Sequence, residues 1–400
     1  MNEQNKKVPT VRFKGFTNDW EQHKLRKVAC INPKTNIPDN FKYVDLESVV
    51  GTSLIKAKLT TKQLAPSRAQ RVAKKGDIFY QTVRPYQKNN FLFDINNYDF
   101  QYVFSTGYAQ LRSEINNYFL FSYLQRQRFV NLILRRSTGT SYPAISSKDL
   151  SEIKIIFPRN SKEQENIGKI INLIDALITL QQRKLDLLKQ LKKGLLQKMF
   201  ADKDSKRPIL RFEGFTGNWE IRQLKELGEI ITGNTPKTSQ VENYSSNGIP
   251  WVTPTDINSV YTTDSAKRLS TVGKDKAKIA PANSLLVTCI ASIGKNTLIL
   301  QESAFNQQIN ALIPVKNDPF FLLAESAKWS RIMRNLAGQT SMQIINKKTF
   351  SGISTSIPDL KEQKIIGSLF KKLDNTIAFQ QQRISRVNEI KKSLLQQMFI

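Results

Sequence analysis

The side chains that could do chemistry in this chain are basic, aromatic, hydroxyl and amide groups gathered in a few short stretches. The first half contributes Arg68, Arg71, Arg84, Tyr86 and Lys88, and then Arg135, Arg136, Thr138, Thr140, Ser141 and Tyr142. The second half contributes Thr235, Lys237, Thr238, Trp251, Thr253 and Thr255, and then Lys295, Asn296, Gln339, Ser341 and Gln343. Arginine can bind guanine, and asparagine or glutamine can bind adenine, through paired hydrogen bonds, while lysine, threonine and serine bind phosphates. As a set these residues predict DNA contacts, although each one taken singly also fits a solvated surface.

The chain has little with which to build an active site. It contains one histidine, His23, and two cysteines, Cys30 and Cys289, without Cys-x-x-Cys spacing. Histidine-dependent catalysis, a thiolate zinc site and a disulfide framework are therefore not expected. Glycine-rich phosphate loops are missing, and so is the Pro-Pro turn that a DNA amino-methyltransferase needs. We expect no catalytic residue, no metal site and no cofactor in this chain.

The charge of the chain indicates a polyanionic partner. The sequence has 61 Lys and Arg against 33 Asp and Glu, a net charge of +28 over 400 residues. A surface with so large an excess repels itself unless a polyanion binds it. A lysine-rich codon bias is the alternative explanation, but such a bias should raise glutamate too, and acids are scarce. Nucleic acid is therefore the expected partner.

The sequence carries no targeting or membrane signal. Its first residues, Met1 to Lys7, are polar, and the chain has no apolar run of about 18 residues. We expect a cytoplasmic protein that contacts no membrane.

The elements that must position these side chains are repeated. Nine of the 17 residues from Pro9 to Leu25 recur in Pro208 to Leu224, including Arg-Phe-x-Gly-Phe and Trp-Glu. A second block, Lys162-Glu163-Gln164, returns at the same offset of 199 residues as Lys361-Glu362-Gln363. Two blocks at one offset indicate a tandem duplication. The repeated aromatic residues are interpreted as packing anchors: Phe13, Trp20, Phe212 and Trp219.

Each repeat ends in a long helix with an apolar seam. Seam residues follow one another in steps of four and three, the spacing of a coiled coil. The first seam consists of Ile167, Ile171, Ile174, Ile178, Leu185, Leu188, Leu195 and Met199. The second consists of Ile366, Phe370, Leu373, Ile377, Ile384, Val387, Leu394 and Met398. Polar Gln181 and Lys192 interrupt the first, and Gln380 and Lys391 interrupt the second at the same places.

We expect the two helices to form an antiparallel coiled coil related by a pseudo-two-fold axis. At about 1.5 Å per residue each would be a rod of nearly 60 Å, suited to act as a spacer. The alternative is that each helix packs only on its own domain.

The regions between the repeats, 26–157 and 225–357, share little sequence and read as mixed α/β. Short strands are expected at 76–80, 82–86, 99–104, 283–288 and 309–314, and helices at about 116–135 and 319–336. The expected fold is therefore a tandem of mixed α+β recognition domains joined by two long helices. The boundaries are 1–160 and 201–360 for the domains, and 161–200 and 361–400 for the helices.

Together these features resemble the specificity subunit of type I restriction-modification systems over essentially the whole chain. The resemblance is carried by the two Arg-Phe-x-Gly-Phe…Trp frames and by the Lys-Glu-Gln helices that end in Leu-Leu-Gln-x-Met-Phe. The second region adds Gly233-Asn-Thr-Pro236, Gly248-Ile-Pro-Trp251 and Phe305-Asn-Gln-Gln-Ile-Asn310. The first region adds Gly76-Asp77-Ile78, Arg84-Pro85 and Ser105-Thr106-Gly107.

The resemblance implies a non-catalytic subunit that selects the DNA sequence for partner enzymes. Each region would read one half of an asymmetric, two-part target in double-stranded DNA, and the helix pair would set the gap. The helices would also dock two modification subunits, which methylate adenine at N6 with S-adenosylmethionine. Restriction subunits, which use ATP and Mg²⁺, would join that core. The rival interpretation is a coiled-coil structural adaptor that binds DNA without sequence preference.

Overall fold

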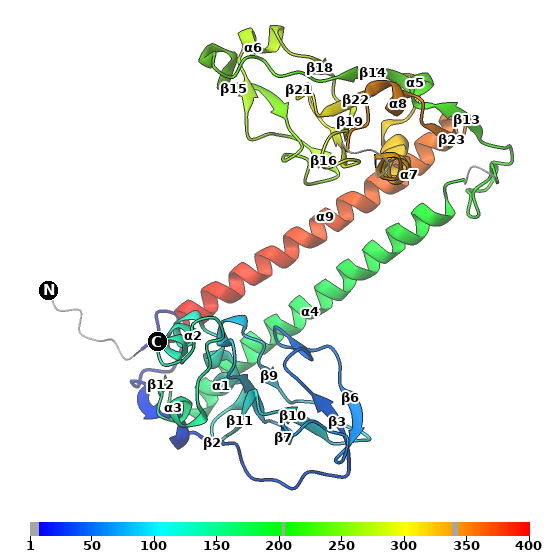
Figure 1. Cartoon of the computed structure of the whole chain (residues 1–400). Coiled ribbons are helices and arrows are strands. Elements are labelled where there is room, and N and C mark those ends of the chain that lie inside the picture. The colour runs from blue at the N-terminus through cyan, green and yellow to red at the C-terminus, as the bar shows by residue number, and fades with distance from the viewer. Residues whose placement is uncertain (1–7, 202–204, 338–342) are drawn as a thin grey trace. The chain divides into compact units, whose positions relative to one another are not determined.

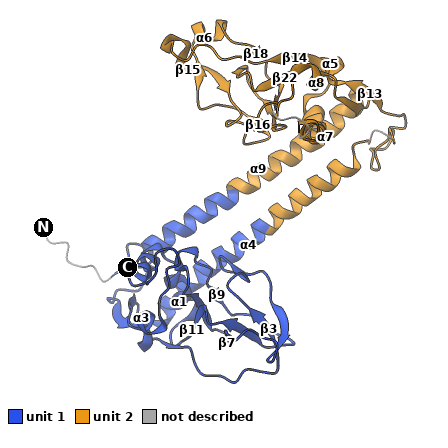
Figure 2. Cartoon of the chain, viewed as in Figure 1, with its two compact units in different colours: residues 1–182, 383–400 blue, residues 183–382 orange. Residues whose placement is uncertain are grey.

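The computed structural model describes residues 8–201, 205–337 and 343–400 (Figure 1). The chain divides into two compact units, one made of residues 1–182 and 383–400 and the other of residues 183–382 (Figure 2). Each unit contains one mixed α/β domain and parts of both long helices, α4 (Ser161–Lys198) and α9 (Leu360–Gln397). The expected fold class of tandem α/β domains with two long helices is confirmed.

The domain of unit 1 is built from two four-stranded sheets. The first sheet has the order β2 (Ala29–Ile31), β11 (Tyr108–Ser113), β8 (Ile78–Gln81) and β9 (Phe91–Leu92). The second has the order β6 (Lys58–Thr61), β3 (Asn40–Val44), β10 (Tyr102–Ser105) and β7 (Ala69–Val72), with β3 and β10 parallel. Phe79 of β8 stacks on Phe104 of β10 at 3.6 Å between ring centroids. An aromatic core therefore joins the two sheets.

The domain of unit 2 repeats this strand order. One sheet runs β14 (Gly228–Thr232), β22 (Ile309–Pro314), β19 (Leu285–Thr288), β20 (Asn296–Ile299) and β16 (Tyr261–Thr262). The other runs β17 (Arg268–Leu269), β15 (Tyr244–Val252), β21 (Ser303–Phe305) and β18 (Ile279–Ala280), with β15 and β21 parallel. The two main sheets of each unit thus have the same strand order in regions with little common sequence, apart from the added strand β16 in unit 2.

The remaining strands and α-helices lie around these sheets, and α7 (Pro319–Ala337) is the longest of them at 19 residues. In unit 1 they are β1 (Glu21–Lys24) paired with β12 (Lys154–Phe157), β4 (Val49–Val50) paired with β5 (Ser53–Leu54), α1 (Asn117–Leu124), α2 (Gln127–Leu134) and α3 (Ser147–Ser151). In unit 2 they are β13 (Glu220–Gln223) paired with β23 (Ser354–Ile357), α5 (Leu224–Leu227), α6 (Thr271–Asp275), α7 (Pro319–Ala337) and α8 (Lys347–Ser351). No helix in the described part of the chain is long and apolar enough to cross a membrane.

Two local expectations for the first domain were wrong. The single helix expected at 116–135 is broken into α1 and α2, because Arg126 is extended (φ −66°, ψ 141°) and its side chain is buried. The strand expected at 82–86 is instead a turn, in which Arg84 is left-handed (φ 53°) and Pro85–Gln87 forms a 3-10 helix. The helix expected at 319–336 corresponds to α7.

The repeated frame is fastened to the first turn of each long helix by a buried ion pair. Arg12 donates from Nε and Nη2 to the two carboxylate oxygens of Glu163, at 2.7 and 2.9 Å. Arg211 donates in the same way to Glu362, at 2.8 and 2.7 Å. The side chains of Glu163 and Glu362 are 1% and 0% exposed. Trp20 adds a hydrogen bond from its indole N–H to Glu163 at 3.3 Å.

The glutamine that follows each glutamate ties the same helix to the α/β domain. Gln164 accepts from the backbone N–H of Asn116, the N-cap of α1, at 3.0 Å, and donates to the carbonyl of Pro158 at 2.8 Å. Gln363 makes the matching bonds to Asp318 and Pro358, at 3.0 and 2.9 Å. The Lys-Glu-Gln repeat is therefore a joint between frame, domain and helix.

Within each unit the segments of α4 and α9 run antiparallel. In unit 1 the ammonium of Lys391 lies 2.5 Å from Asp175, and in unit 2 Lys192 pairs with Asp374. The seam positions are buried or half-buried in both helices, and these include the four polar interruptions. Each seam lysine thus reaches an aspartate of the other helix. Because both helices contribute to both units, the alternative that each packs only on its own domain does not hold.

A phenylalanine just after the end of each long helix packs in a domain core. Phe399 packs against Trp20 and Phe119 in unit 1, with ring centroids 6.4 and 5.3 Å away. Phe200 packs against Trp219 and Phe321 in unit 2, at 6.2 and 5.3 Å. The Met-Phe pair at the end of each repeat is therefore part of a hydrophobic core.

We predict that Glu163→Gln destabilises unit 1 by about 3 kcal/mol, because removing one partner of a buried ion pair leaves the other charge uncompensated. Urea denaturation followed by tryptophan fluorescence would show a lower midpoint. The control is Glu165→Gln, whose exposed carboxylate pairs with Lys162 and should leave the midpoint unchanged. Equal shifts in both variants would contradict the assignment.

Candidate DNA interface

In unit 1 the structure brings together the turn after β8 and the loop after α2. The guanidinium of Arg84 lies 4.2 Å from the ring centroid of Tyr142. The backbone N–H of Arg84 donates to the carbonyl of Pro143 at 2.7 Å, and Val83 forms a bridge with Ala144. Tyr142 and Tyr86 are 63% and 49% exposed. Two of the stretches named from the sequence thus form one basic and aromatic surface.

The backbone of this turn is strained. Arg84 (φ 53°) and Lys88 (φ 55°) are both left-handed, a conformation that residues with a side chain seldom adopt. Strain of this kind concentrates at binding sites and persists only where surrounding contacts hold it. Here the bond to Pro143 and the stacking on Tyr142 hold Arg84.

The other residues named in the first half fall into three groups. Arg68 lies near this surface, since its carbonyl accepts from Thr106 and the adjacent Gly107 carbonyl accepts from Thr82, at 2.8 and 3.0 Å. Arg71 is half-buried on β7, and burial lowers the pKa of its guanidinium. The residues that lead from α2 into the loop are exposed: Arg135, Arg136, Thr138, Thr140 and Ser141.

Unit 2 has the same backbone arrangement with different side chains. Ala291, left-handed at φ 61°, donates to the carbonyl of Gln343 at 3.3 Å, as Arg84 does to Pro143. Ile345 donates to Cys289 at 2.8 Å, as Ile145 does to Thr82 at 3.0 Å. A small apolar residue therefore stands where unit 1 has arginine.

The polar residues named in the second half lie on neighbouring loops of unit 2. Thr253 bonds to Thr255 and Asp256, at 2.8 and 2.6 Å, and the ammonium of Lys295 reaches the carbonyl of Pro254 at 3.5 Å. The side chains of Lys237, Thr238, Thr255, Lys295 and Gln343 are exposed. These residues present ammonium, hydroxyl and amide groups, without the arginine and tyrosine of unit 1.

Two residues named in the second half have structural partners. Trp251 is buried, and its indole N–H donates to the carbonyl of Asn234 at 3.2 Å, which holds the loop that carries Thr235. Asn296 donates to Ser330 at 2.9 Å. Gln339 and Ser341 lie outside the described residues.

The sequence reasoning missed one side chain of this surface. Exposed Gln307 accepts a hydrogen bond from the hydroxyl of Thr235 at 2.5 Å. It belongs to the Phe305–Asn310 motif, which the sequence supports only as a sign of resemblance to specificity subunits. The signal available in the sequence was the pair of amide residues, Gln307 and Gln308, inside that motif.

The surface offers hydrogen bonding and charge, and the described residues contain no group of three or more His, Cys, Asp or Glu able to hold a metal ion. Cys289 is buried, and burial raises the pKa of its thiol to about 11. The thiol is therefore neutral near pH 7 and is not a nucleophile.

Comparison with known proteins matches both halves of the chain. Residues 17–190 and 216–389 each match the family described as type I restriction modification DNA specificity domain. The chain is 24% identical to the HindI specificity subunit of Haemophilus influenzae, covering 93% of this chain and 97% of that protein. It is 27% identical to the EcoR124I/EcoR124II specificity subunit of Escherichia coli, over 40% of this chain and 41% of that one.

A solved structure shares the fold. It is the crystal structure of a type I restriction-modification S subunit from M. genitalium, with a TM-score of 0.69 and 15% identity. The alignment covers 98% of this chain and 99% of that structure.

Arg84→Gly should lower the affinity for DNA without lowering the stability of the protein. Glycine relieves left-handed strain of roughly 1 kcal/mol, which offsets the lost stacking, so the melting temperature should stay the same or rise. Affinity for the protein's target duplex should fall about tenfold, the value of one lost base contact.

The matched control is Ala291→Gly, which relieves the same strain and removes only a methyl group. It should raise the melting temperature without changing DNA affinity. An Arg84→Gly protein with unchanged affinity would remove Arg84 from the interface.

Proposed function

The chain belongs to the type I restriction-modification DNA specificity family, whose members are non-catalytic subunits that recognise DNA sequence, and we propose that it reads an asymmetric, two-part target. The observation that carries this proposal is the repeated topology with unlike loops. Strand order and backbone bonds agree in the two domains, while Ala291 stands in unit 2 where unit 1 has Arg84. Arginine favours guanine, and amide groups favour adenine. Two unlike readers select two unlike half-sites.

We propose that the helix pair sets the gap between the half-sites. Each helix is 38 residues long, and each carries a seam lysine that pairs with an aspartate of the other helix. A rod held in register by largely half-buried ion pairs resists sliding, because a shift would leave those charges unpaired. This supports a fixed spacing.

The outer face of α4 supports docking of modification subunits. Five leucines in steps of four, three, seven and four are 39–63% exposed: Leu173, Leu177, Leu180, Leu187 and Leu191. A helix that is solvated on this face would carry polar residues there, so an exposed apolar stripe fits a protein partner. Two methyltransferase subunits and the restriction subunits would bring S-adenosylmethionine, ATP and Mg²⁺, and the complex would act in the cytoplasm.

The test is to map methylated bases by long-read sequencing in cells that express this chain with and without a modification subunit encoded beside it. We expect an asymmetric, two-part adenine motif only when both are present. A soluble complex that yields no motif would overturn the proposal and favour the adaptor interpretation.

Deleting one heptad from both helices, residues 180–186 and 379–385, should shorten the gap of the motif by about three base pairs. Seven residues span roughly 10 Å of helix, and B-DNA rises about 3.4 Å per base pair. The double deletion keeps the seam in register, so the same deletion in α4 alone is the control that should abolish the motif. An unchanged gap in the double deletion would refute the spacer role.

A further inference from the structure

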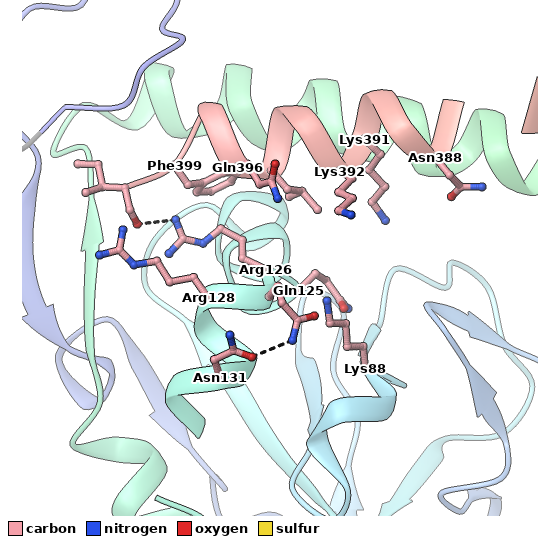
Figure 3. A pocket seen from close by; sticks show the side chains of 13 residues that line it. Lys88, Gln125, Arg126, Arg128, Asn131, Asn388, Lys391, Lys392, Gln396 and Phe399 are labelled. Carbon is pink, nitrogen blue, oxygen red and sulfur yellow. Dashed lines mark hydrogen bonds between the residues drawn. The ribbon is translucent and has the colours of Figure 1, made fainter. Parts of the chain in front are cut away.

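A cavity of about 710 Å³ in unit 1 is lined by cations from three segments that are distant in sequence. Lys88 comes from the turn after β8, Arg126 and Arg128 from the start of α2, and Lys391 and Lys392 from the end of α9. In Figure 3, Lys88 points toward the space below Lys391 and Lys392. Among the described residues no aspartate or glutamate lines this cavity.

Arg126 is the buried charge of this cavity. It is 6% exposed, its guanidinium lies 4.0 Å from the ring centroid of Tyr123, and it donates to the carbonyl of Ile400 at 2.6 Å (Figure 3). Its Nε has no hydrogen-bond partner in the described structure. Burial lowers the pKa of this guanidinium. The described partners of Arg126 are thus an aromatic ring and the oxygen of Ile400, and no described aspartate or glutamate lies beside it.

The lysines around it repel one another. Burial lowers the pKa of Lys88, and the charges of Lys391 and Lys392 lower it further. Only Lys391 has a described acidic partner, Asp175 at 2.5 Å. Gln125 is 7% exposed, and its amide nitrogen also lacks a described partner. The cavity thus combines uncompensated cations with a spare amide donor, as an anion site requires.

The positive charge continues along α2 toward the surface that contains Arg84 and Tyr142. A second cavity of about 480 Å³ shares Arg126 and Arg128 and adds Arg135, Arg136 and Lys154, again without a described acid. Arg135 and Arg136 lead into the loop that ends in Tyr142, and Lys88 closes the turn that begins at Arg84. The cations therefore form a band that meets the candidate interface at two points.

The matching cavity of unit 2 has fewer cations in its described lining. Its cavity beside the end of α4 is lined by Lys192, which corresponds to Lys391 in the repeat, and by Lys295 and Asp374. Asp374 pairs with Lys192, so Lys295 is the remaining cation of that lining. The two halves differ in charge at the same place in the fold.

We propose that the cavity between α2, the Lys88 turn and the end of α9 binds backbone phosphates of the DNA duplex beside the first reading domain. The ligand chemistry is a phosphate anion, and an extended polyanion fits best because the basic band is continuous with the reading loops. Duplex DNA carries one charge per about 1.7 Å of its axis, so several phosphates can engage such a band. This assignment rests on the proposed function, and it gives unit 1 the larger electrostatic share of DNA affinity.

The test measures duplex binding over a range of salt concentrations, with the full chain alone and in complex with its modification subunit. The double variant Arg128→Gln/Lys392→Gln removes two exposed charges of the cavity. Each lost phosphate contact lowers the slope of log affinity against log salt by about 0.9, so we expect a decrease of about 1.8. The preference for the target over a scrambled duplex should remain, because phosphate contacts carry no sequence information.

The matched control is Lys193→Gln/Arg331→Gln, which removes two exposed charges from unit 2, where Lys193 occupies the repeat position of Lys392. The slope of log affinity against log salt should change much less in this control variant. Equal decreases in both double variants, or no decrease in either, would overturn the cavity assignment while the target preference stands. If the unmodified protein shows no preference for the target over the scrambled duplex, the proposed function itself is wrong.

A second arm separates DNA from free phosphates. Sodium pyrophosphate is compared with sodium chloride of equal ionic strength in thermal melting of both double variants and the unmodified chain. If pyrophosphate stabilises the unmodified chain selectively while the DNA salt slopes of all three proteins agree, the cavity binds a small phosphate compound and the DNA assignment is wrong.

Discussion

The rest of this structure depends on the buried ion pair between a frame arginine and the first-turn glutamate of a long helix. Glu163 and Glu362 are almost fully buried, so each carboxylate needs a cation in fixed geometry, and a bidentate guanidinium supplies it. The next residue, Gln164 or Gln363, bonds to the domain backbone. Frame, domain and helix therefore meet at one joint in each unit. The exposed loops of each domain consequently have a fixed orientation relative to the helix that the domain contacts.

That joint explains how one scaffold can carry loops of different chemistry. The strand order is held by backbone hydrogen bonds and by cores such as the Phe79–Phe104 stack, which make no demand on the exposed loop side chains. The same left-handed turn recurs with arginine in one unit and alanine in the other. The exposed loop side chains can therefore differ between the two units while the architecture stays the same.

The distribution of charge adds a second asymmetry to that of the loops. The net charge of +28 is not spread evenly over equivalent places. The seam lysines of both helices are neutralised by aspartates, whereas the cations around α2 lack described acidic partners. Neutralised lysines keep the helices in register, and uncompensated cations are available to a polyanion.

Sequence alone determined the duplication, the heptad seams, the mixed α/β interiors and the family, because repeated identity and a 3.5-residue period are properties of local spacing. It could not determine the break at Arg126, the left-handed turn at Arg84, the burial of Trp251 or the approach of Lys88 to Lys391. Each of these depends on a contact between segments far apart in the chain, such as Arg126 with Ile400 or Arg84 with Tyr142. Only tertiary structure decides such contacts, since burial and charge proximity depend on which distant surfaces meet rather than on the order of residues.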